Sequence, residues 1–117
     1  MITTISIPLH TVSEMNIKEH WAKSHSRHKE QKKMIFLSLH CYEIPRTLPV
    51  TITMTRLSSR FLDDDNLQGA FKYVRDAIAE HFIPGLAVGR ADDDKRITWK
   101  YSQRKDKKKY TQLDFEW

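Results

Sequence analysis

The sequence predicts one α/β domain of the α+β kind, in which a mixed four-stranded sheet packs against helices. Four segments alternate apolar and polar residues, as half-buried strands do, and two segments repeat apolar residues every three or four positions, as amphipathic helices do. Their order is β-α-β-α-β-β, which favours parallel strands joined by helical crossovers and a final antiparallel hairpin. The chain has 117 residues and no visible linker or repeat, so we expect residues 1–117 to form a single domain.

The first half of the chain predicts a strand, a helix and a second strand. Residues 2–9 alternate, and Pro8 closes this strand. Apolar residues return at helical spacing in the later part of residues 16–43, and Pro45 ends that helix. Residues 50–55 alternate again and are rich in β-branched side chains, so they predict the second strand.

The second half predicts a helix and two more strands. Apolar residues between Leu67 and Ile78 fall at helical spacing directly behind an acidic triplet, of which one member is expected to be the N-cap. Residues 81–91 contain Pro84 and Gly85 and predict a loop. Residues 97–102 and 110–117 alternate as strands do, and we expect residues 104–109 to form the basic tip of a hairpin between them.

Composition excludes several classes of protein. Hydrophobic residues make up 39% of the chain, with only 3 Gly and 4 Pro, which excludes collagenous and fully disordered chains. The lone Cys41 excludes an internal disulfide and a cysteine-rich zinc site. Apolar runs are much shorter than the roughly 18 to 20 residues of a membrane span, and the N-terminus lacks a signal-peptide pattern. We therefore expect a cytoplasmic protein without a membrane partner and, since no glycine-rich phosphate loop is present, without a nucleotide cofactor.

Charge is distributed unevenly along the chain. The 20 Lys and Arg residues outnumber the 15 Asp and Glu residues, giving a formal net charge of +5, and six of the carboxylates form the triplets Asp63–Asp65 and Asp92–Asp94. A protein that only holds nucleic acid gains nothing from concentrated acid, whereas one that positions divalent cations against phosphate needs it. This pattern favours a polyanionic partner and a divalent metal. The alternative that each triplet is only a solvated turn with an N-cap stays open.

The residues around the two triplets resemble a known motif. It consists of three parts, which are Asp63-x-Asp65-Asn66-Leu67-Gln68, an amphipathic helix with a lysine and Asp76, and Asp93-Asp94-x-x-Ile97. This pattern is similar to that of the RusA family of Holliday junction resolvases. The resemblance implies a homodimeric, Mg²⁺-dependent endonuclease, with Mn²⁺ as a substitute, that nicks four-way DNA junctions. It further implies that Asp63, Asp65, Asp93 and Asp94 bind the metal, and that Asp63, Asp65 and Asp94 are catalytic.

A lysine belongs to this motif four residues after its second aspartate, where this chain has Gly69. Positions i, i+4, i+7 and i+11 share a stripe of one continuous helix, and here they are Asp65, Gly69, Lys72 and Asp76. We expect Lys72 to lean across Gly69 and to serve as a catalytic residue in place of the missing lysine. The alternative is a lysine on the solvated helix face.

Two basic segments are the predicted DNA-binding surfaces. The first is residues 18–33, including Lys23 and Arg27, and the second is the predicted hairpin tip with Lys107, Lys108 and Lys109. Trp21 lies in the first segment and is either a base-stacking residue or an anchor of the core or of an interface. The histidines of this segment, His25 and His28, are expected to face solvent.

Three functional hypotheses follow from these observations. The leading one is a metal-dependent nuclease for branched DNA, and the second is a non-catalytic, structure-selective DNA-binding protein of the same fold. The third is a basic protein-interaction module, which would show no salt-dependent affinity for DNA. Because a four-way junction offers two symmetric scissile sites, the first hypothesis also predicts a two-fold dimer. It further predicts that the two acidic triplets converge in the fold, close enough to share one or two metal ions.

Overall fold

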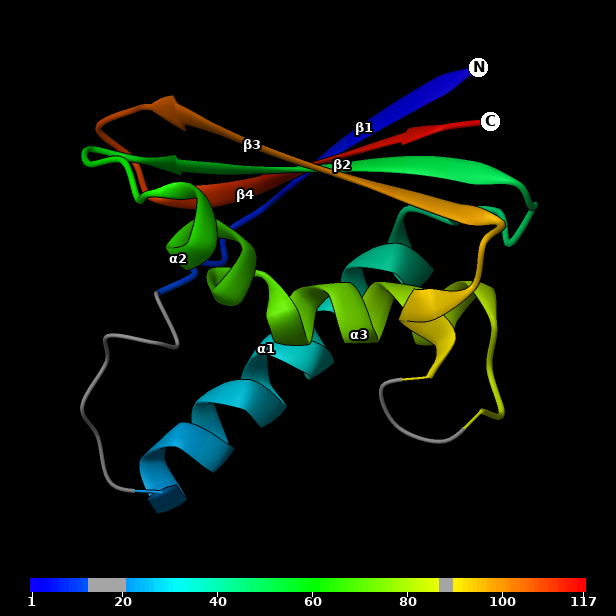
Figure 1. The fold of residues 1–117 in the computed structure, drawn as a ribbon, viewed down its shortest axis with the longest axis horizontal. Helices are drawn as coiled ribbons and strands as arrows, with labels where there is room; N and C mark the ends of the chain where they lie inside the picture. Colours follow the sequence, from blue (N-terminus) through cyan, green and yellow to red (C-terminus); the bar gives the residue numbers. More distant parts are fainter. Residues whose placement is uncertain (13–20, 87–89) are drawn as a thin grey trace.

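The computed structural model describes residues 1–12, 21–86 and 90–117. Along the chain these form β1 (Ile2–Ile7), α1 (Trp21–Cys41), β2 (Val50–Ser58), α2 (Asp64–Ala70), α3 (Lys72–Phe82), a short 3-10 helix η1 (Ala91–Asp93), β3 (Ile97–Lys105) and β4 (Tyr110–Glu116) (Figure 1). The predicted class is confirmed, since the described residues form an α+β fold with a mixed four-stranded sheet.

The strand order of the sheet is β1-β4-β2-β3, with β4 antiparallel to both of its neighbours and β2 parallel to β3. The predicted hairpin of the last two strands is therefore wrong, because β2 lies between them. The chain passes around the end of β2, where the Asp106 amide donates to the Ser58 carbonyl at 3.1 Å. The physical reason is burial: β4 has fully buried residues such as Leu113 and Phe115 and takes a central place, whereas β3 keeps Lys100 exposed at the sheet edge.

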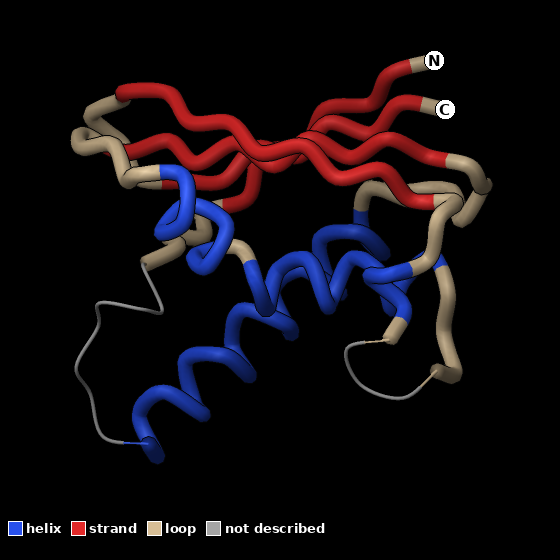
Figure 2. Tube along the Cα trace, in the orientation of Figure 1, coloured by secondary structure: helices blue, strands red, loops and turns tan. Residues whose placement is uncertain are grey.

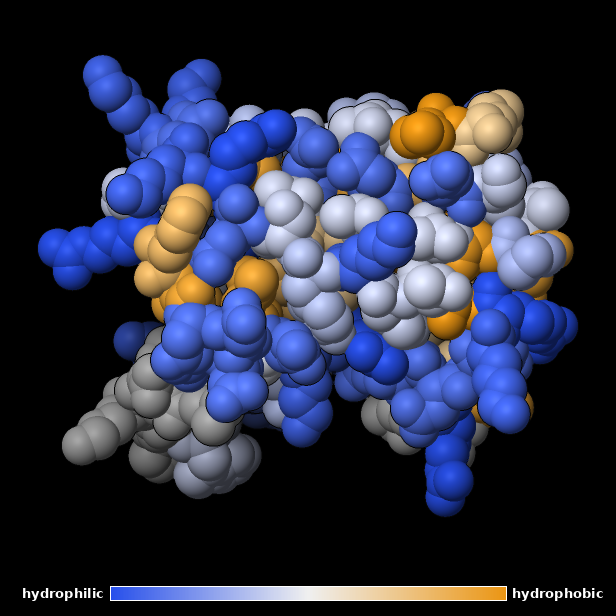
Figure 3. Space-filling model, turned by 45° about the horizontal axis from the view of Figure 1, so that its top comes forward, coloured by the Kyte–Doolittle hydropathy of each residue, from blue (hydrophilic) through white to orange (hydrophobic). Residues whose placement is uncertain are grey.

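The described helices all lie on one face of the sheet, and no described helix covers the other face (Figures 1 and 2). The core fills the space between the sheet and the helices α1 and α3. Its fully buried members include Ile35, Leu39, Ile52, Met54, Val74, Ile78, Leu113 and Phe115. The opposite sheet face has threonine, serine and lysine side chains on β3 and is mostly pale and blue in Figure 3. The two faces explain the apolar-polar alternation of the strands.

The chain breaks its helical path at Phe71, between α2 and α3. Phe71 has φ −96° and ψ 2°, and its amide donates to the Gln68 carbonyl at 3.2 Å, so the first helix ends there and a second begins at Lys72. The Phe71 side chain is fully buried and anchors the break in the core. Gly69 weakens the helix just before it. The predicted single helix behind the first acidic triplet is therefore wrong, and two short helices replace it.

None of the helices in the described part of the chain is both long and apolar enough to cross a membrane.

Candidate functional site

The first acidic triplet forms the start of α2. Asp63 is the N-cap, and its Oδ1 accepts a hydrogen bond from the Asn66 amide at 2.9 Å, while Asp64 and Asp65 occupy the first turn. Negative charge is favourable at this end of a helix because of the helix dipole. The predicted N-cap is confirmed. All three side chains are exposed, so Asp63 and Asp65 are accessible to a ligand.

The start of α2 is fastened to the end of β3. The Gln103 side chain accepts from the Leu62 amide at 2.9 Å and donates to the Leu62 carbonyl at 2.7 Å. Beside this clamp, the Lys105 Nζ lies 5.3 Å from the centre of the Phe61 ring. Asp63 therefore follows a residue that is hydrogen-bonded to the sheet on both of its main-chain polar groups.

The second triplet lies in and directly after η1, where two of its members are already paired. The Arg96 guanidinium binds both carboxylate oxygens of Asp94 at 3.0 Å, and the Arg96 amide adds a third hydrogen bond. These hydrogen bonds from Arg96 lower the pKa of Asp94 to about 2. Asp93 is exposed. A metal ion at Asp94 would therefore compete with Arg96 for the carboxylate oxygens.

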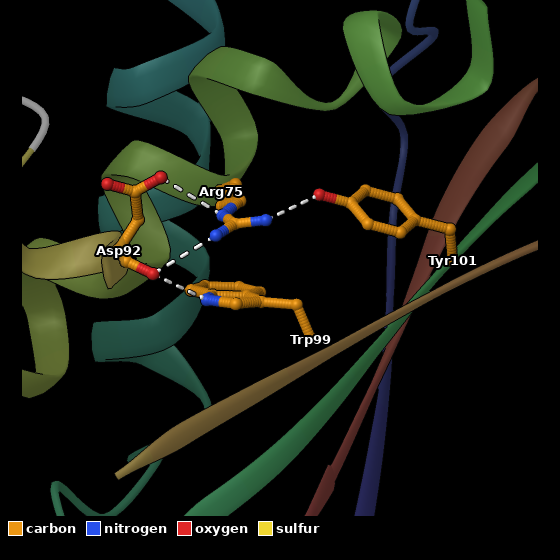
Figure 4. Close-up of polar contacts among 4 residues, drawn as sticks. All are labelled: Arg75, Asp92, Trp99 and Tyr101. Atoms are coloured by element: carbon orange, nitrogen blue, oxygen red, sulfur yellow. Dashed lines mark hydrogen bonds and ion pairs between the residues drawn. The ribbon is translucent and has the colours of Figure 1, made fainter. Parts of the chain in front are cut away.

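The third member, Asp92, belongs to a network that joins α3, η1 and β3 (Figure 4). Arg75 donates to the Tyr101 hydroxyl at 2.8 Å and to the Asp92 carbonyl at 3.1 Å, and its Nε lies 3.0 Å from the Asp92 carboxylate. Trp99 donates its indole N–H to the same carbonyl at 3.0 Å, and its ring lies 4.9 Å from the guanidinium. Sequence reasoning missed Arg75, because nothing in the local pattern connects α3 to a residue 17 positions further along the chain.

The structure does not bring the two triplets together. In the parallel β2–β3 pair, Val50 lies opposite Ile97 and Ser58 opposite Lys105. The first triplet follows the end of β2 and the second precedes the start of β3, so the two lie at opposite ends of strands about 26 Å long. Figure 1 shows α2 and the yellow η1 segment at opposite ends of α3. Among the described residues, no three His, Cys, Asp or Glu side chains are placed to hold one metal ion, and the expected convergence within one chain is wrong.

Asp76 of α3 has the clearest unfavourable environment among the described carboxylates. Burial raises the pKa of Asp76, and the like charges of Asp92 and Glu80 raise it further. Lys32 of α1 and Lys72 act in the opposite direction. The resemblance motif includes Asp76, although sequence reasoning gave it no role. Carboxyls with a perturbed pKa are found more often at functional sites than elsewhere, although structural networks such as this one also produce them.

Lys72 does not share a helix with Asp65. The break at Phe71 separates α2 from α3, so the predicted stripe through Gly69 is interrupted and gives Lys72 no path across that glycine. Lys72 is exposed at the start of α3, with its Nζ 5.4 Å from the centre of the Tyr73 ring.

The elements that have the predicted DNA-binding residues lie at the same end of the molecule as the first triplet (Figure 1). Lys107, Lys108 and Lys109 are exposed in the β3–β4 connection, Lys23 is exposed on α1, and Arg27 is half-buried. The β3–β4 connection, α2 and the N-terminal half of α1 all lie at the same end of the molecule (Figure 1). The first three positions of the predicted basic segment, 18–20, lie outside the described residues.

The aromatic residues of α1 differ in their surroundings. Trp21 is 75% exposed, so it is not an anchor of this chain's core. His25 faces solvent as predicted, but His28 is half-buried and stacks on Tyr73 with ring centres 3.6 Å apart. Trp99 and Tyr101 are half-buried against the core.

No family model matches this chain, and no curated protein matches it.

Proposed function

We propose that this protein is a Mg²⁺-dependent endonuclease that cuts branched DNA, with four-way junctions as the substrate and Asp63 and Asp65 as the metal-binding and catalytic carboxylates. The observation that supports this proposal best is the position of these two exposed side chains at the start of α2, at the end of the molecule that also has the β3–β4 connection and the N-terminal half of α1. Carboxylates at the same end of a molecule as many cationic side chains suit a metal ion that meets a phosphate.

Two carboxylates are a sufficient protein contribution for magnesium. Mg²⁺ keeps several of its waters and is usually held by one or two carboxylates together with substrate phosphates. Asp63 has one oxygen engaged with the Asn66 amide, which fixes its orientation, and Asp65 is exposed in the first turn of α2. A bound Mg²⁺ would activate water and offset charge on the leaving oxygen, and Mn²⁺, which also accepts oxygen ligands, is a suitable substitute.

The other residues of the chain have supporting roles in this proposal. DNA phosphates are held by basic side chains of α1 and of the β3–β4 connection, namely Lys23, Arg27, Lys107, Lys108 and Lys109. Because a junction has two symmetric scissile sites, we propose that the active form is a homodimer. Asp93 and Asp94 lie at the far end of the β2–β3 pair and cannot reach the same ion as Asp63 within one chain.

The second candidate is a non-catalytic DNA-binding protein with the same basic surface. It is favoured by the separation of the triplets and by the engagement of Asp94 with Arg96. In this case the first triplet serves as a helix cap and the second as a turn.

One experiment separates the two candidates. The protein is incubated with an end-labelled four-way junction, a linear duplex and a single strand, each in Mg²⁺, in Mn²⁺ and in EDTA. The nuclease proposal expects paired nicks in the junction with either metal and none in EDTA. Salt-dependent junction binding without nicks in any metal supports the second candidate. Absence of salt-dependent binding contradicts both and supports a protein-interaction module.

A further inference from the structure

A hollow of about 530 Å³ lies between α1 and the start of α3, and its described lining includes no member of either acidic triplet. The lining consists of His25, His28, Lys29 and Lys32 of α1 and Tyr73 of α3. The four α1 positions are spaced i, i+3, i+4 and i+7, so they share one face of the helix. None of these lining residues is acidic, which makes the hollow suitable for an anion.

One wall of the hollow is aromatic and held in place. Tyr73 and His28 are both half-buried, and their rings stack at 3.6 Å with an angle of 19° between the planes. The Lys72 Nζ lies 5.4 Å from the centre of the Tyr73 ring and adds positive charge beside this wall. Rings that are already fixed lose little further conformational entropy when a ligand packs against them.

The lysines of the hollow supply the charge. Lys29 is exposed and Lys32 is half-buried. Lys32 lies close enough to α3 for its charge to lower the pKa of Asp76, whereas burial raises that pKa. Ammonium groups beside an aromatic wall match a ligand in which a phosphate is joined to a planar ring. Proteins that hold single-stranded nucleic acid combine these two features, since cations follow the backbone and aromatic rings contact the bases.

We propose that this hollow binds one unpaired nucleotide of a DNA strand, with its base against the stacked pair of His28 and Tyr73 and its phosphate beside Lys29 and Lys32. The proposal rests on the DNA-binding part of the proposed function and adds a position for an unpaired base, which a branch point supplies and a continuous duplex does not.

The test is a binding measurement in EDTA, where no cutting occurs. Fluorescence anisotropy compares a labelled oligothymidylate with an abasic strand of the same length, which keeps the phosphates and lacks the bases. We expect the wild-type protein to bind the thymidylate about 5- to 150-fold more tightly, the range that one base packed on an aromatic side chain contributes. Free thymidine monophosphate should bind much more weakly than the strand.

Variants locate the effect in the hollow. Tyr73→Leu should remove the preference for thymidylate over the abasic strand, and Tyr73→Phe should keep it. Lys32→Gln should weaken binding of both strands. Lys95→Gln is the matched control, because Lys95 is an exposed lysine that lies outside both basic segments and does not line the hollow. Photo-crosslinking of a 4-thiothymidine strand to the wild-type protein should label Tyr73 or His28, and this readout does not depend on the folding of any variant.

Equal affinity of the wild-type protein for thymidylate and abasic strands would overturn the proposal, as would a crosslink outside the hollow. Free thymidine monophosphate binding as tightly as the strand would also overturn it, in favour of a free nucleotide as ligand. The results that overturn the nucleotide site differ from those that overturn the proposed function. Absence of nicks with the base preference intact contradicts only the nuclease, whereas absence of binding to either strand contradicts the DNA-binding function itself.

Discussion

Gln103 holds Leu62 by both of its main-chain polar groups, the amide at 2.9 Å and the carbonyl at 2.7 Å, although the two residues are 41 positions apart. The Gln103 side chain thus binds the main chain of Leu62 where the chain has left β2 and approaches α2, beyond the last paired residue of that strand. Because the next residue is Asp63, the clamp positions the carboxylate on which the proposed chemistry depends.

Removing this clamp should affect the position of α2 more than the rest of the fold. We expect Gln103→Ala to lower the free energy of unfolding by about 1–3 kcal/mol, because two half-buried hydrogen-bonding groups lose their partner. Cleavage should fall more than junction affinity, since the basic segments remain. Urea unfolding and single-turnover cleavage measure the two effects. Ser102→Ala is the control, because Ser102 is exposed at the neighbouring position of β3, and equal cleavage by both variants would show that the clamp does not position the site.

Asp76 should make the protein less stable as pH rises. Burial, Asp92 and Glu80 raise its pKa in the folded state above the ordinary value of 3.8. The folded state therefore binds the Asp76 proton more tightly than the unfolded state does. The stability gained from this proton is fully present below pH 3.8 and is lost as pH rises through the folded-state pKa. We expect Asp76→Asn to unfold at a higher temperature than wild type at neutral pH, with the difference disappearing below pH 3.8. Glu30→Gln, on the exposed side of α1, is the control. A gain that is independent of pH would contradict this explanation.

Gln31 should be replaceable with a gain in stability. It is 2% exposed in the middle of α1, and neither its amide nitrogen nor its carbonyl oxygen has a hydrogen-bond partner in the described structure. A buried amide without partners costs about 1–3 kcal/mol. Gln31→Leu should therefore raise the midpoint of thermal unfolding, whereas Gln68→Leu on an exposed position should not. A lower midpoint for Gln31→Leu would show that the amide is satisfied in solution.

The exposed lysines of the β3–β4 connection should determine part of the salt dependence of DNA binding. Neutralising Lys107, Lys108 and Lys109 together with glutamine should reduce the slope of log affinity against log salt by up to about three units, one for each phosphate that a lysine no longer neutralises. Lys95→Gln, near η1 at the far end of the β2–β3 pair, should leave the slope unchanged. The opposite pattern would place the DNA on the end of the molecule that contains η1.

The elements of the fold could be predicted from local patterns, because alternation and helical spacing record which side chains face the core. The pairing of β4 between β1 and β2 could not, since the alternation of Tyr110–Glu116 is the same in a central strand and in a hairpin. The break at Phe71 also has no strong local signal. It depends on the burial of one ring in a core that forms only in three dimensions.

For the candidate site, an N-cap within the first triplet was predicted from the residue type and from the helical spacing behind it, and the structure shows that this N-cap is Asp63. The separation of the two triplets could have been predicted from the order of strands and acids along the chain. An acid that follows one strand and an acid that precedes a parallel neighbour must lie at opposite ends of the pair, and this applies to Asp63 and Asp94 once β2 and β3 are parallel. The network of Arg75, Asp92 and Trp99 could not be predicted, because it joins three elements that no local sequence pattern relates to one another.

The most direct test of the central claim compares three single substitutions in the first triplet, Asp63→Asn, Asp65→Asn and Asp64→Asn, by single-turnover cleavage of a labelled four-way junction in Mg²⁺. Asparagine preserves the helix cap at position 63 because it is also a favoured N-cap residue, so folding and junction affinity should be retained. We expect Asp63→Asn and Asp65→Asn to lose cleavage while Asp64→Asn cuts at the wild-type rate. Wild-type cleavage by Asp63→Asn, or equal loss in all three variants, would contradict the assignment of Asp63 and Asp65 as the metal-binding pair.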